Sequence, residues 1–510
     1  MPRYAAIDIG SNSIRMMAAE TSPGTPARIL AQDRQVTRLG DSVFRTGVLS
    51  DDAISLACEV LARMAEEYKR LDVVAVRAVA TAAVRDTRNQ DVFLERASRA
   101  LGAPVEIIPG REEARLIHLG VQSRWPQPGK RVLITDIGGG SAELVAADDC
   151  RMRDAISKQL GAVRLRTLFL DSDPPAPQQL HRMRGYIAER LAGVPARFGV
   201  ASWDRAIGTS ATAAAVVCAV NRIPRTRRDE ADRHRASTAQ IRKLYEKLGT
   251  MPLAERRKVT GIGPSRAEII VAGTAVLLSV LEAFGLPSVY FSVAGVRDGI
   301  IADLAARGVG GELSGLSPEQ RKEVENLARK YGVALAHARK VAELAHSLFD
   351  SLHPLHGLAP GYGKLLQASA FLHDIGHYVN DAGHHKHSYY LVANSDLSGF
   401  TARERELIAN LCRYHRKAMP SAAHPNFQSL SPEERRVLLL LAPLLRLADN
   451  LDRGHEQRIR GVECQVRNGQ VVMRLASADD IDLEQWAAER AGEVFHQVYG
   501  TPIVLEKGRA

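Results

Sequence analysis

The pattern of hydrophobic and polar positions from residue 4 to about residue 308 predicts alternating strands and helices. Short apolar runs at 4–9 and 73–83 are typical of buried strands. In residues 50–71 apolar side chains recur every three or four positions, with Ile54, Leu61 and Met64 on one stripe, and this period predicts an amphipathic helix. Strands that alternate with helices predict an α/β fold for this part of the chain.

Changes in composition along the chain predict four domains. The polar break at Ser123–Arg131 is followed by a new strand and a glycine loop, and Gly308–Ser317 has the glycine and serine content of a linker. From Pro318 to about Leu451 nearly every segment has a helical period. The predicted boundaries are residues 1–125 and 126–308 for two α/β domains, 316–453 for a helical domain and 454–510 for a C-terminal domain.

The C-terminal domain is predicted to be a small α+β unit. Two runs that alternate hydrophobic and polar positions flank Asn468-Gly469, and an Asn-Gly pair between such runs is typical of a β-hairpin. A helix over residues 483–499 and a last strand are predicted to follow. The apolar stretches Ile269–Leu281 and Val437–Leu445 are shorter than the about 20 residues that cross a bilayer, so they predict buried helices.

Composition narrows the classes of partner. The 510 residues carry a net charge of +10, which favours nucleic acid, a membrane surface or phosphate-rich small molecules, although a solvated basic surface explains the charge equally well. Only 5% of the residues are aromatic, which argues against stacking of single-stranded nucleic acid. The five cysteines form no Cys-x-x-Cys pair, and the start of the chain has no apolar signal region. We therefore expect a cytoplasmic protein without a membrane partner or a specific nucleic-acid partner.

The densest basic run is Arg222–Arg235. A run of this kind can attract a polyanion over a distance. A solvated loop accounts for the same residues equally well.

Two glycine loops share one design. "IDIGSNS", Ile7–Ser13, and "TDIGGGS", Thr135–Ser141, each place an aspartate, Ile-Gly, two small residues and a serine at the end of an apolar strand. Glycine lets the backbone approach a phosphate closely, and successive N–H groups form a concave anion site. A single loop also fits a tight turn, but two copies predict a phosphate clamp. The candidate phosphate-binding residues are Gly10, Ser11, Asn12, Ser13, Gly138, Gly139, Gly140 and Ser141.

The charged residues beside these loops have different expected roles. Asp8 and Asp136 cannot bind phosphate directly because like charges repel, but they can hold Mg²⁺ or orient a water molecule. Arg15 either reaches a phosphate or pairs with a neighbouring carboxylate.

The paired loops resemble those of the actin, Hsp70 and sugar-kinase superfamily, in which two halves of a duplicated ribonuclease H-like core clamp a phosphate chain. Five further stretches are similar to the Ppx/GppA family of exopolyphosphatases and guanosine pentaphosphate phosphohydrolases. They are Arg77–Asn89, Ile107–Val121, Ala206–Val216, Gly261–Gly273 and Val293–Ile300. The resemblance implies a duplicated actin-like α/β core, an all-α HD-like domain and a small α+β tail.

The resemblance also implies the reaction, removal of a terminal phosphate, and its residues. This reaction needs an anchored chain, a metal, an activated water and stabilisation of the transferring group. Glu113 of "PGREEAR" is the implied base, with Glu112 as the fallback, although either could simply be a favourable carboxylate at a helix N-terminus. Arg85 is expected to bridge phosphate oxygens. The remaining implied residues are Asp136, Glu143 and Asp8 for Mg²⁺ or Mn²⁺, and Gly208, Thr209 and Ser210 for phosphate. K⁺ as an activator and a homodimer are implied as well.

Two departures from the family pattern affect the expected substrate more than the reaction. Ala82 stands where the family often has a serine, which removes one hydroxyl donor. Ala211 stands in "GTSAT" where the family pattern has glycine, and its side chain limits how closely a ligand approaches the backbone.

A second constellation lies in the predicted helical domain. His337, His373-Asp374 and Asp449 follow the order His, His-Asp, Asp on separate helices, which resembles the metal site of HD phosphohydrolases. Imidazole and carboxylate ligands suit Mn²⁺, Fe²⁺ or Mg²⁺. A lone His-Asp pair is usually a packed or capping pair, and the order of all four residues favours a second divalent metal. Further histidines lie nearby in sequence, at His384, His385, His387 and His415.

Three classes of function follow. The first is an exopolyphosphatase that acts on inorganic polyphosphate, with a pppGpp 5′-phosphatase as its closest variant. The second is an ATP-driven kinase or chaperone of the same superfamily, which lacks support because no peptide-binding β-domain is predicted. The third is a nucleotide or alarmone sensor, or phosphohydrolase, whose chemistry belongs to the HD-like site.

Overall fold

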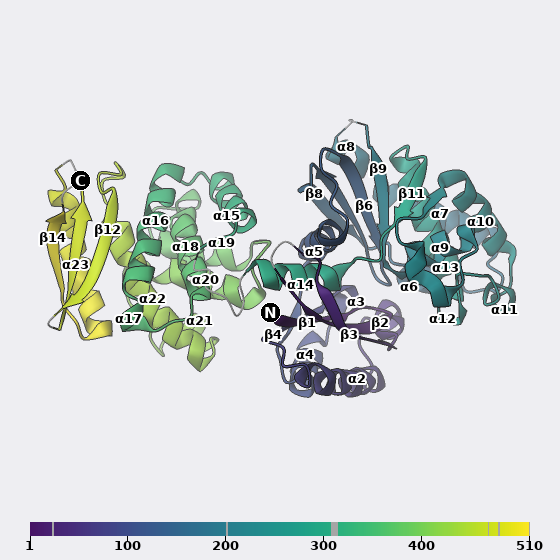
Figure 1. Ribbon diagram of the computed structural model, residues 1–510, viewed down its shortest axis with the longest axis horizontal. Helices are drawn as coiled ribbons and strands as arrows, with labels where there is room; N and C mark the ends of the chain where they lie inside the picture. The colour runs from purple at the N-terminus through teal and green to yellow at the C-terminus, as the bar shows by residue number, and fades with distance from the viewer. Residues whose placement is uncertain (23–24, 200–201, 308–314, 468, 478–479, 509–510) are drawn as a thin grey trace. The chain divides into compact units, whose positions relative to one another are not determined.

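The computed structural model consists of two compact units, Met1–Ala306 and Arg307–Ala510 (Figure 1). The structure describes residues 1–22, 25–199, 202–307, 315–467, 469–477 and 480–508. Among these, the first unit contains two sheets and the second contains one. The first unit ends just before the predicted linker, most of which (308–314) lies outside the described residues.

The first sheet of the N-terminal unit has five strands in the order β3-β2-β1-β4-β5. β1 pairs antiparallel with β2 and parallel with β4, so it lies at the centre of the sheet. The strand runs predicted at 4–9 and 73–83 correspond to β1 and β4. The bounds are β1 (Arg3–Ile9), β2 (Ser13–Glu20), β3 (Arg28–Val36), β4 (Ala75–Ala80) and β5 (Val105–Ile107).

The second sheet repeats this topology. Its order is β10-β11-β9-β6-β7-β8, in which β6 pairs antiparallel with β7 and parallel with β9, and β10 is an added edge strand. The bounds are β6 (Arg131–Ile137), β7 (Ala142–Asp148), β8 (Arg151–Lys158), β9 (Arg205–Thr209), β10 (Arg235–Ser237) and β11 (Ser288–Phe291).

The repeat extends to individual residues. Asp8 is the register partner of Arg15 across β1 and β2, and Asp136 is the register partner of Glu143 across β6 and β7. Both sheets also carry an irregularity at the same place in the outer strand pair, at Ala18/Ala19 and at Ala146/Ala147. The predicted duplicated α/β core is therefore visible in both topology and register.

Two helices exchange between the halves of this unit. α5 (Gly110–Arg124) follows the first sheet and packs against β7 and β8 of the second, whereas α14 (Val296–Ala306) follows the second sheet and packs against β1 of the first. The two helices also pack against each other. A Cβ atom on Gly299 would lie 1.8 Å from the carbonyl oxygen of Leu116, so only glycine permits this approach. This crossing places the N-terminus of α5, with Glu113, beside the ends of both sheets.

The other helices of the unit follow their sequence signals. α2 (Asp51–Lys69) confirms the helix predicted at 50–71: the Ser50 hydroxyl accepts from the Ala53 N–H at its start, and its apolar stripe is buried. α13 (Ile270–Ala283) is apolar on all sides and confirms the buried helix predicted at 269–281. The rest are α1 (Leu39–Thr46), α3 (Ala82–Asp86), α4 (Gln90–Leu101), α6 (Ala162–Phe169), α7 (Pro177–Leu191), α8 (Val194–Phe198), α9 (Ser210–Asn221), η1 (Arg225–Ala231), α10 (Thr238–Thr250), α11 (Leu253–Arg256) and α12 (Pro264–Ala267).

The C-terminal unit begins with a helical part. Three of its helices start with a capping box, in which a serine or threonine and a Gln or Glu three residues later satisfy each other's backbone N–H groups; these are α15, α20 and α22. The bounds are α15 (Pro318–Lys330), α16 (Leu335–Ser351), α17 (His353–His356), α18 (Gly361–Leu372), η2 (Ile375–Tyr378), α19 (His384–Ala393), α20 (Ala402–Tyr414), α21 (Pro425–Gln428) and α22 (Pro432–Asn450).

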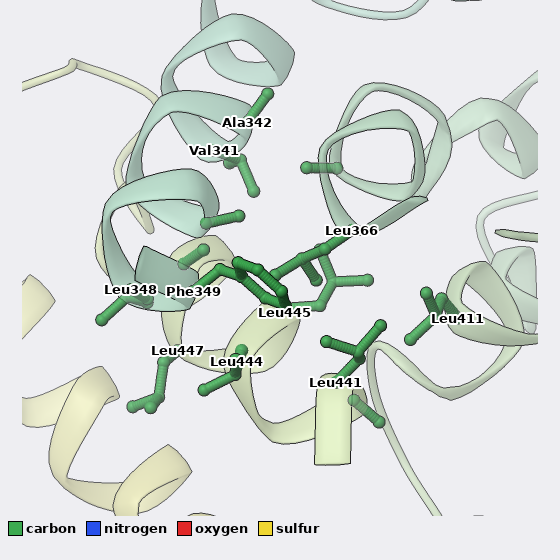
Figure 2. Close-up of a cluster of buried hydrophobic side chains, with 14 of the residues drawn as sticks. Val341, Ala342, Leu348, Phe349, Leu366, Leu411, Leu441, Leu444, Leu445 and Leu447 are labelled. Carbon is green, nitrogen blue, oxygen red and sulfur yellow. The ribbon is translucent and has the colours of Figure 1, made fainter. Parts of the chain in front are cut away.

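α22 supplies much of the core of this unit. Leu441, Leu444 and Leu445 pack with Phe349 of α16 and Leu366 of α18, and all five side chains are buried (Figure 2). The buried helix predicted at Val437–Leu445 is therefore confirmed. Burial of each such side chain contributes about 1.5–3 kcal/mol relative to exposure.

The chain ends in a three-stranded sheet of order β12-β13-β14 with one helix. β12 (Gly461–Arg467) and β13 (Gln470–Ala476) form the predicted hairpin, although Asn468 lies outside the described residues. α23 (Asp482–Tyr499) and β14 (Ile503–Gly508) confirm the predicted helix and last strand.

All five cysteines are free thiols, three of them buried, as their scattered positions predict. Across the described part of the chain, no helix combines the length and the apolar character needed to span a bilayer.

Candidate phosphoryl-transfer site

The two glycine loops have the same backbone turn. The Gly10 N–H donates to the Ser13 carbonyl at 3.2 Å, and the Gly138 N–H donates to the Ser141 carbonyl at 3.0 Å. Each loop connects the first two strands of its sheet, so the repeat of the sheets brings both turns to one cleft. All eight predicted phosphate-binding residues of the loops line that cleft.

The two loops lie in direct contact. A Cβ atom on Gly139 would be 3.0 Å from the Ser11 Cβ and 3.3 Å from the Asn12 nitrogen, and one on Gly140 would be 2.6 Å from the Ser11 Oγ. Glycine is therefore required for this approach. The Ser11 Oγ and Asn12 Nδ2 atoms are buried without a hydrogen-bond partner in the described structure. Buried polar groups are seldom left unpaired, so these two groups fit contacts to an oxygen-rich ligand.

Carboxylates gather beside the loops, all of them buried except the half-buried Asp8. Asp8, Asp136 and Glu113 line the cleft, while Glu143 lies behind it and accepts a hydrogen bond from the Ser157 hydroxyl at 2.7 Å. Burial, and then Asp136, raise the pKa of Glu143 to about 7. Burial also raises the pKa of Asp8, against the opposing charges of Arg15 and Arg297. A cation among these groups would relieve their repulsion.

Asp136 is held by the end of β9. Its Oδ2 accepts from the Thr209 hydroxyl at 2.5 Å. Burial raises the pKa of Asp136, and the Thr209 bond opposes that rise. The sequence predicted that Thr209 binds phosphate. In the structure Thr209 is fully buried, so it positions Asp136 and is not itself placed to contact a phosphate.

The two neighbouring glutamates of α5 have different surroundings. Glu113 faces the cleft, where burial and the Glu143 carboxylate raise its pKa well above the ordinary value. Glu112 points instead into a buried ion-pair cluster, with Arg115 at 2.8 Å and Arg77 at 3.1 Å. Burial opposes the ionisation of Glu112, but Arg115 and Arg77 hold its pKa below the ordinary value. Of the pair, only Glu113 is placed to meet a substrate, so the structure does not support the fallback assignment to Glu112.

Arg85 binds Glu113 in this structure. Its Nη1 donates to the Ile108 carbonyl at 2.7 Å and lies 3.4 Å from the Glu113 Oε2. This cation opposes the rise in the pKa of Glu113. Arg85 itself is not among the residues that line the described cleft, and its pair with Glu113 places it beside a carboxylate that does.

Four arginines also line the cleft: Arg15, Arg228, Arg266 and Arg297. Burial, and then the charge of Arg15, lower the pKa of Arg266 to about 9 and that of Arg297 to about 10. Arginines that repel one another at one cleft fit a polyanionic ligand, since each phosphate would offset that repulsion.

Arg266 and Arg297 were not singled out from the sequence, although both lie inside motifs that resemble the family. Each of those motifs contains a single arginine among small and apolar residues, and this feature could have identified both residues. Arg228 belongs to the basic run Arg222–Arg235, whose other described members, such as Arg227, are largely exposed. The run therefore contributes one side chain to the cleft rather than a general basic surface.

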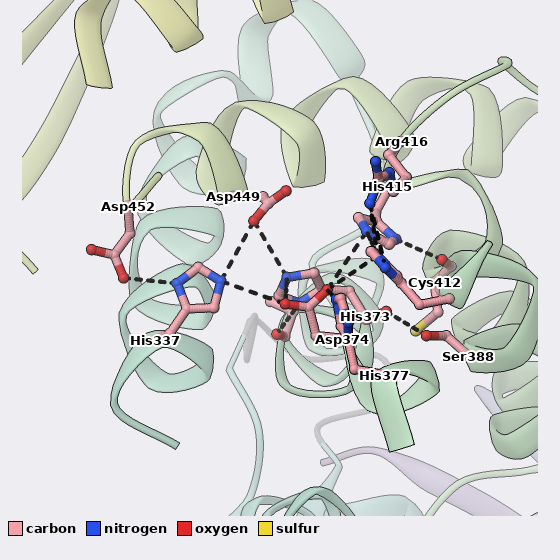
Figure 3. A network of polar contacts seen from close by, with 12 residues as sticks. His337, His373, Asp374, His377, Ser388, Cys412, His415, Arg416, Asp449 and Asp452 are labelled. Carbon is pink, nitrogen blue, oxygen red and sulfur yellow. Dashed lines mark hydrogen bonds and ion pairs between the residues drawn. The ribbon is translucent and has the colours of Figure 1, made fainter. Parts of the chain in front are cut away.

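The four residues of the second constellation also come together in the C-terminal unit. The Asp449 Oδ1 lies 3.5 Å from the His337 Nε2 and 3.4 Å from the His373 Nε2, and the Asp374 Oδ2 lies 3.5 Å from the same His373 atom (Figure 3). These side chains come from α16, the end of α18 and α22.

Comparison with known proteins decides the family. The model of the Ppx/GppA phosphatase family matches residues 17–307, and the model of domain III of Ppx/GppA phosphatases matches residues 320–488. The chain belongs to the Ppx/GppA phosphatase family.

Solved structures agree with this assignment over 59% of the chain. The Aquifex aeolicus PPX-GPPA enzyme is 30% identical over 59% of this chain and 99% of its own, with a TM-score of 0.52. An exopolyphosphatase-like protein is 28% identical over 59% and 97%, with a TM-score of 0.55. An exopolyphosphatase from Cytophaga hutchinsonii, 23% identical over 59% and 97% with a TM-score of 0.54, shares the fold.

The departures from the Ppx/GppA pattern lie at the cleft itself. Ala82 and Ala211 both line it. Ser210, also on the cleft wall, begins α9 with a φ of 69°, and its hydroxyl donates to the Ile137 carbonyl at 3.1 Å. Gly208 lies within β9 and does not line the cleft, so of the predicted loop 208–210 only Ser210 is placed to meet a phosphate.

The carboxylates of this Ppx/GppA site fit a magnesium ion. Mg²⁺ prefers carboxylate oxygens and commonly binds to one or two of them together with substrate phosphates. Asp8 and Asp136 face the cleft from equivalent places in the two repeats, and burial raises the pKa of both. Such a pair favours a divalent cation, because the cation would stabilise both ionised forms.

Proposed function

We propose that this Ppx/GppA phosphatase is a Mg²⁺-dependent exopolyphosphatase that hydrolyses the terminal phosphate of inorganic polyphosphate. The observation that carries the proposal is the composition of the cleft. Four arginines and several carboxylates line it together with the two glycine loops, and two side-chain donors of the first loop, on Ser11 and Asn12, lack partners in the described structure. Binding of a phosphate chain would satisfy the arginines and the loop donors at once.

The roles of the residues follow from their places. Loop atoms around Ser11 and Gly139 would hold the terminal phosphates, and Arg266 and Arg297 would neutralise the chain behind them. Mg²⁺, held by Asp8 and Asp136, would supply charge stabilisation of the transferring phosphoryl group.

Glu113 would take a proton from a water molecule whose oxygen attacks the terminal phosphorus. The bond between that phosphorus and the bridging oxygen then breaks, and the shortened chain leaves with the bridging oxygen. One water is consumed and one orthophosphate is released for each phosphate removed.

The lining of the cleft favours polyphosphate over a nucleotide. Among the described residues that line it, none is aromatic. A guanine base is usually held by stacking or by an apolar pocket. The pppGpp 5′-phosphatase activity remains the second candidate, because the family includes both activities by resemblance and because the Aquifex aeolicus relative is described as a PPX-GPPA enzyme.

The direct test compares substrates on one preparation of the full chain. Phosphate release would be measured from long-chain polyphosphate and from pppGpp, each with Mg²⁺ and K⁺. The proposal predicts a higher kcat/KM for polyphosphate, with loss of activity in Glu113→Gln. A higher kcat/KM for pppGpp would favour the second candidate.

The same assay separates the two units. If Glu113→Gln kept full activity while His373→Ala or Asp374→Ala abolished it, the chemistry would belong to the C-terminal unit. If His373→Ala and Asp374→Ala keep full activity while Glu113→Gln loses it, the result supports the proposed site.

A further inference from the structure

A row of charged residues crosses the first sheet from the cleft toward the sheet's edge. Asp8 of β1 is the register partner of Arg15 on β2, and Arg15 is in turn the register partner of Arg34 on β3. Register partners on neighbouring strands point to the same face of a sheet. Strands lie about 4.8 Å apart, so Arg34 starts from a strand about 10 Å away from the strand that carries Asp8. Arg34 therefore extends the charged row of the cleft outward.

Arg34 lines a recess that continues the cleft within the same unit. Three residues line both the cleft and the recess: Ala211, Arg228 and Arg266. The recess adds two further cations, Arg34 and Arg225. Because the cleft and the recess share part of their lining, a long ligand can occupy both at once.

Small residues make room for the recess. Four of them lie three or four positions apart, and so on one face of α9: Ala211, Ala214, Ala215 and Cys218. Gly261 meets the end of that face, where a Cβ atom on it would lie 2.6 Å from the Ala219 nitrogen. A Cβ atom on Gly263 would lie 2.6 Å from the Arg225 Cδ. Both glycines have positive φ angles, so larger residues would change the backbone and the place of Arg225.

The arginines of the recess lack carboxylate partners across the described residues. The Nε atoms of Arg34 and Arg228 are buried without a hydrogen-bond partner there. Arg266 is only 7% exposed, whereas Arg225 is open to solvent. By contrast, Arg227 of the same basic run has its Nη2 2.6 Å from the Glu230 Oε2. Buried donors are seldom left unpaired, so the recess fits a ligand that supplies acceptor oxygens.

The cations of the recess and the cleft repel one another. Burial, and then the charges of Arg15 and Arg228, lower the pKa of Arg34 to about 10. Burial, followed by Arg15 and Arg34, lowers the pKa of Arg266 to about 9. Like charges at directly opposite strand positions, such as Arg15 and Arg34, also destabilise a sheet. A polyanion among these side chains would replace repulsion with attraction.

We propose that the recess is a second anion subsite, which binds phosphates of a linear polyphosphate behind those held at the glycine loops. Arg228 and Arg266 lie where the chain passes from the cleft into the recess, and Arg34 and Arg225 donate to the oxygens of its distal phosphates. The subsite rests on the proposed exopolyphosphatase function and favours chains long enough to reach Arg34. A short chain ends within the cleft and gains nothing from the recess.

The test compares two chain lengths on the full-length protein. The kcat/KM values for long-chain polyphosphate and for tripolyphosphate would be measured with Mg²⁺ for the wild type and for Arg34→Gln/Arg225→Gln. The ratio of the long-chain value to the tripolyphosphate value should fall by about tenfold in the double variant, as expected for the loss of a hydrogen bond to a charged group. An unchanged ratio would overturn the proposal. Arg227→Gln is the matched control from the same basic run and should keep the wild-type ratio, because Arg227 pairs with Glu230 outside the recess.

A binding measurement separates the failure of this proposal from the failure of the proposed function. Isothermal titration calorimetry with a chelator present gives the Kd of long-chain polyphosphate whether or not the protein hydrolyses it. The double variant should bind the long chain about tenfold more weakly than the wild type and Arg227→Gln at one ionic strength. Equal Kd values would overturn the subsite, whereas a wild type that binds the chain but releases no phosphate would contradict the proposed function alone.

Guanosine pentaphosphate is the other source of the same chemistry, because it carries phosphates at two positions of its ribose. The kcat/KM for pppGpp would therefore be measured with the same variants. If Arg34→Gln/Arg225→Gln lowered this value but left the value for long-chain polyphosphate unchanged, the recess would serve the nucleotide and the assignment to a linear chain would be overturned. A fall for long-chain polyphosphate supports the assignment.

Discussion

Arg15 and Glu143 occupy the same position in the two repeats of the N-terminal unit. Each is the register partner of the aspartate that ends the first strand of its sheet, Asp8 for Arg15 and Asp136 for Glu143. The duplicated strands therefore carry opposite charges at one place. One repeat contributes a cation to the cleft, and the other contributes a buried carboxylate behind it.

The position of Arg15 predicts a role in binding the substrate. Arg15→Ala should raise the KM for polyphosphate by about 10–100-fold with a smaller effect on kcat, since a hydrogen bond to a charged group contributes about 1.5–3 kcal/mol. Steady-state phosphate release measures both constants. Arg99→Ala, a change at an exposed arginine of α4, is the control and should leave them unaltered. An unchanged KM in Arg15→Ala would rule out this role.

The bond between Thr209 and Asp136 predicts a shift in the pH dependence of activity. Thr209→Val removes the donor that opposes the raised pKa of Asp136, so that pKa should rise further. Less Asp136 is then ionised at a given pH, and the acid limb of the kcat/KM profile should move to higher pH by about one unit. A profile that superimposes on that of the wild type would show that Asp136 does not act in its ionised form.

The features that the sequence predicted are those encoded by short segments. The two loops, the strands that precede them and the β-hairpin near residue 468 each depend on neighbours in the chain. The duplication was also visible, because "IDIGSNS" and "TDIGGGS" keep the same order of residue types.

The features that the sequence did not predict depend on which way a side chain points. Glu112 and Glu113 are adjacent, and an α-helix turns about 100° per residue, so they face different surroundings. Only the position of α5 between the sheets shows that Glu113 faces the cleft and Glu112 faces Arg77 and Arg115. The approach of His377, His384 and His415 to the Asp374 carboxylate likewise depends on the arrangement of the helices in the C-terminal unit.

Buried His118 predicts loss of stability in acid. Burial lowers the pKa of His118 to about 4, so the folded unit keeps it neutral while the unfolded chain protonates it below about pH 6.5. The contribution of neutral His118 to the free energy of unfolding is therefore complete above about pH 6.5 and is lost as the pH falls toward 4. The free energy of unfolding should fall by about 2 kcal/mol between pH 7 and pH 5.

Urea unfolding of the full chain, monitored by fluorescence of Trp125 and Trp203 in the first unit, measures this loss. His118→Leu should lose less stability than the wild type between the same two pH values. Equal losses in both proteins would show that another group causes the acid sensitivity.

The neighbouring glutamates provide a matched pair of variants. Glu112→Gln should destabilise the first unit by about 3–5 kcal/mol, because it leaves the buried charges of Arg77 and Arg115 undercompensated. Glu113→Gln should leave stability unchanged or increase it, since it removes a buried carboxylate whose pKa is raised. Thermal unfolding of both variants without metal measures the difference. A larger loss of stability in Glu113→Gln than in Glu112→Gln would contradict the placement of Glu112 in the ion-pair cluster and of Glu113 at the cleft.

The most direct test of the account is the rate of phosphate release from long-chain polyphosphate by Glu113→Gln. With Mg²⁺ present and correct folding confirmed by thermal unfolding, kcat should fall by about 10²–10⁴-fold, the usual contribution of a general base. A Glu113→Gln protein that releases phosphate at the wild-type rate would contradict the placement of the chemistry in the cleft between the two loops.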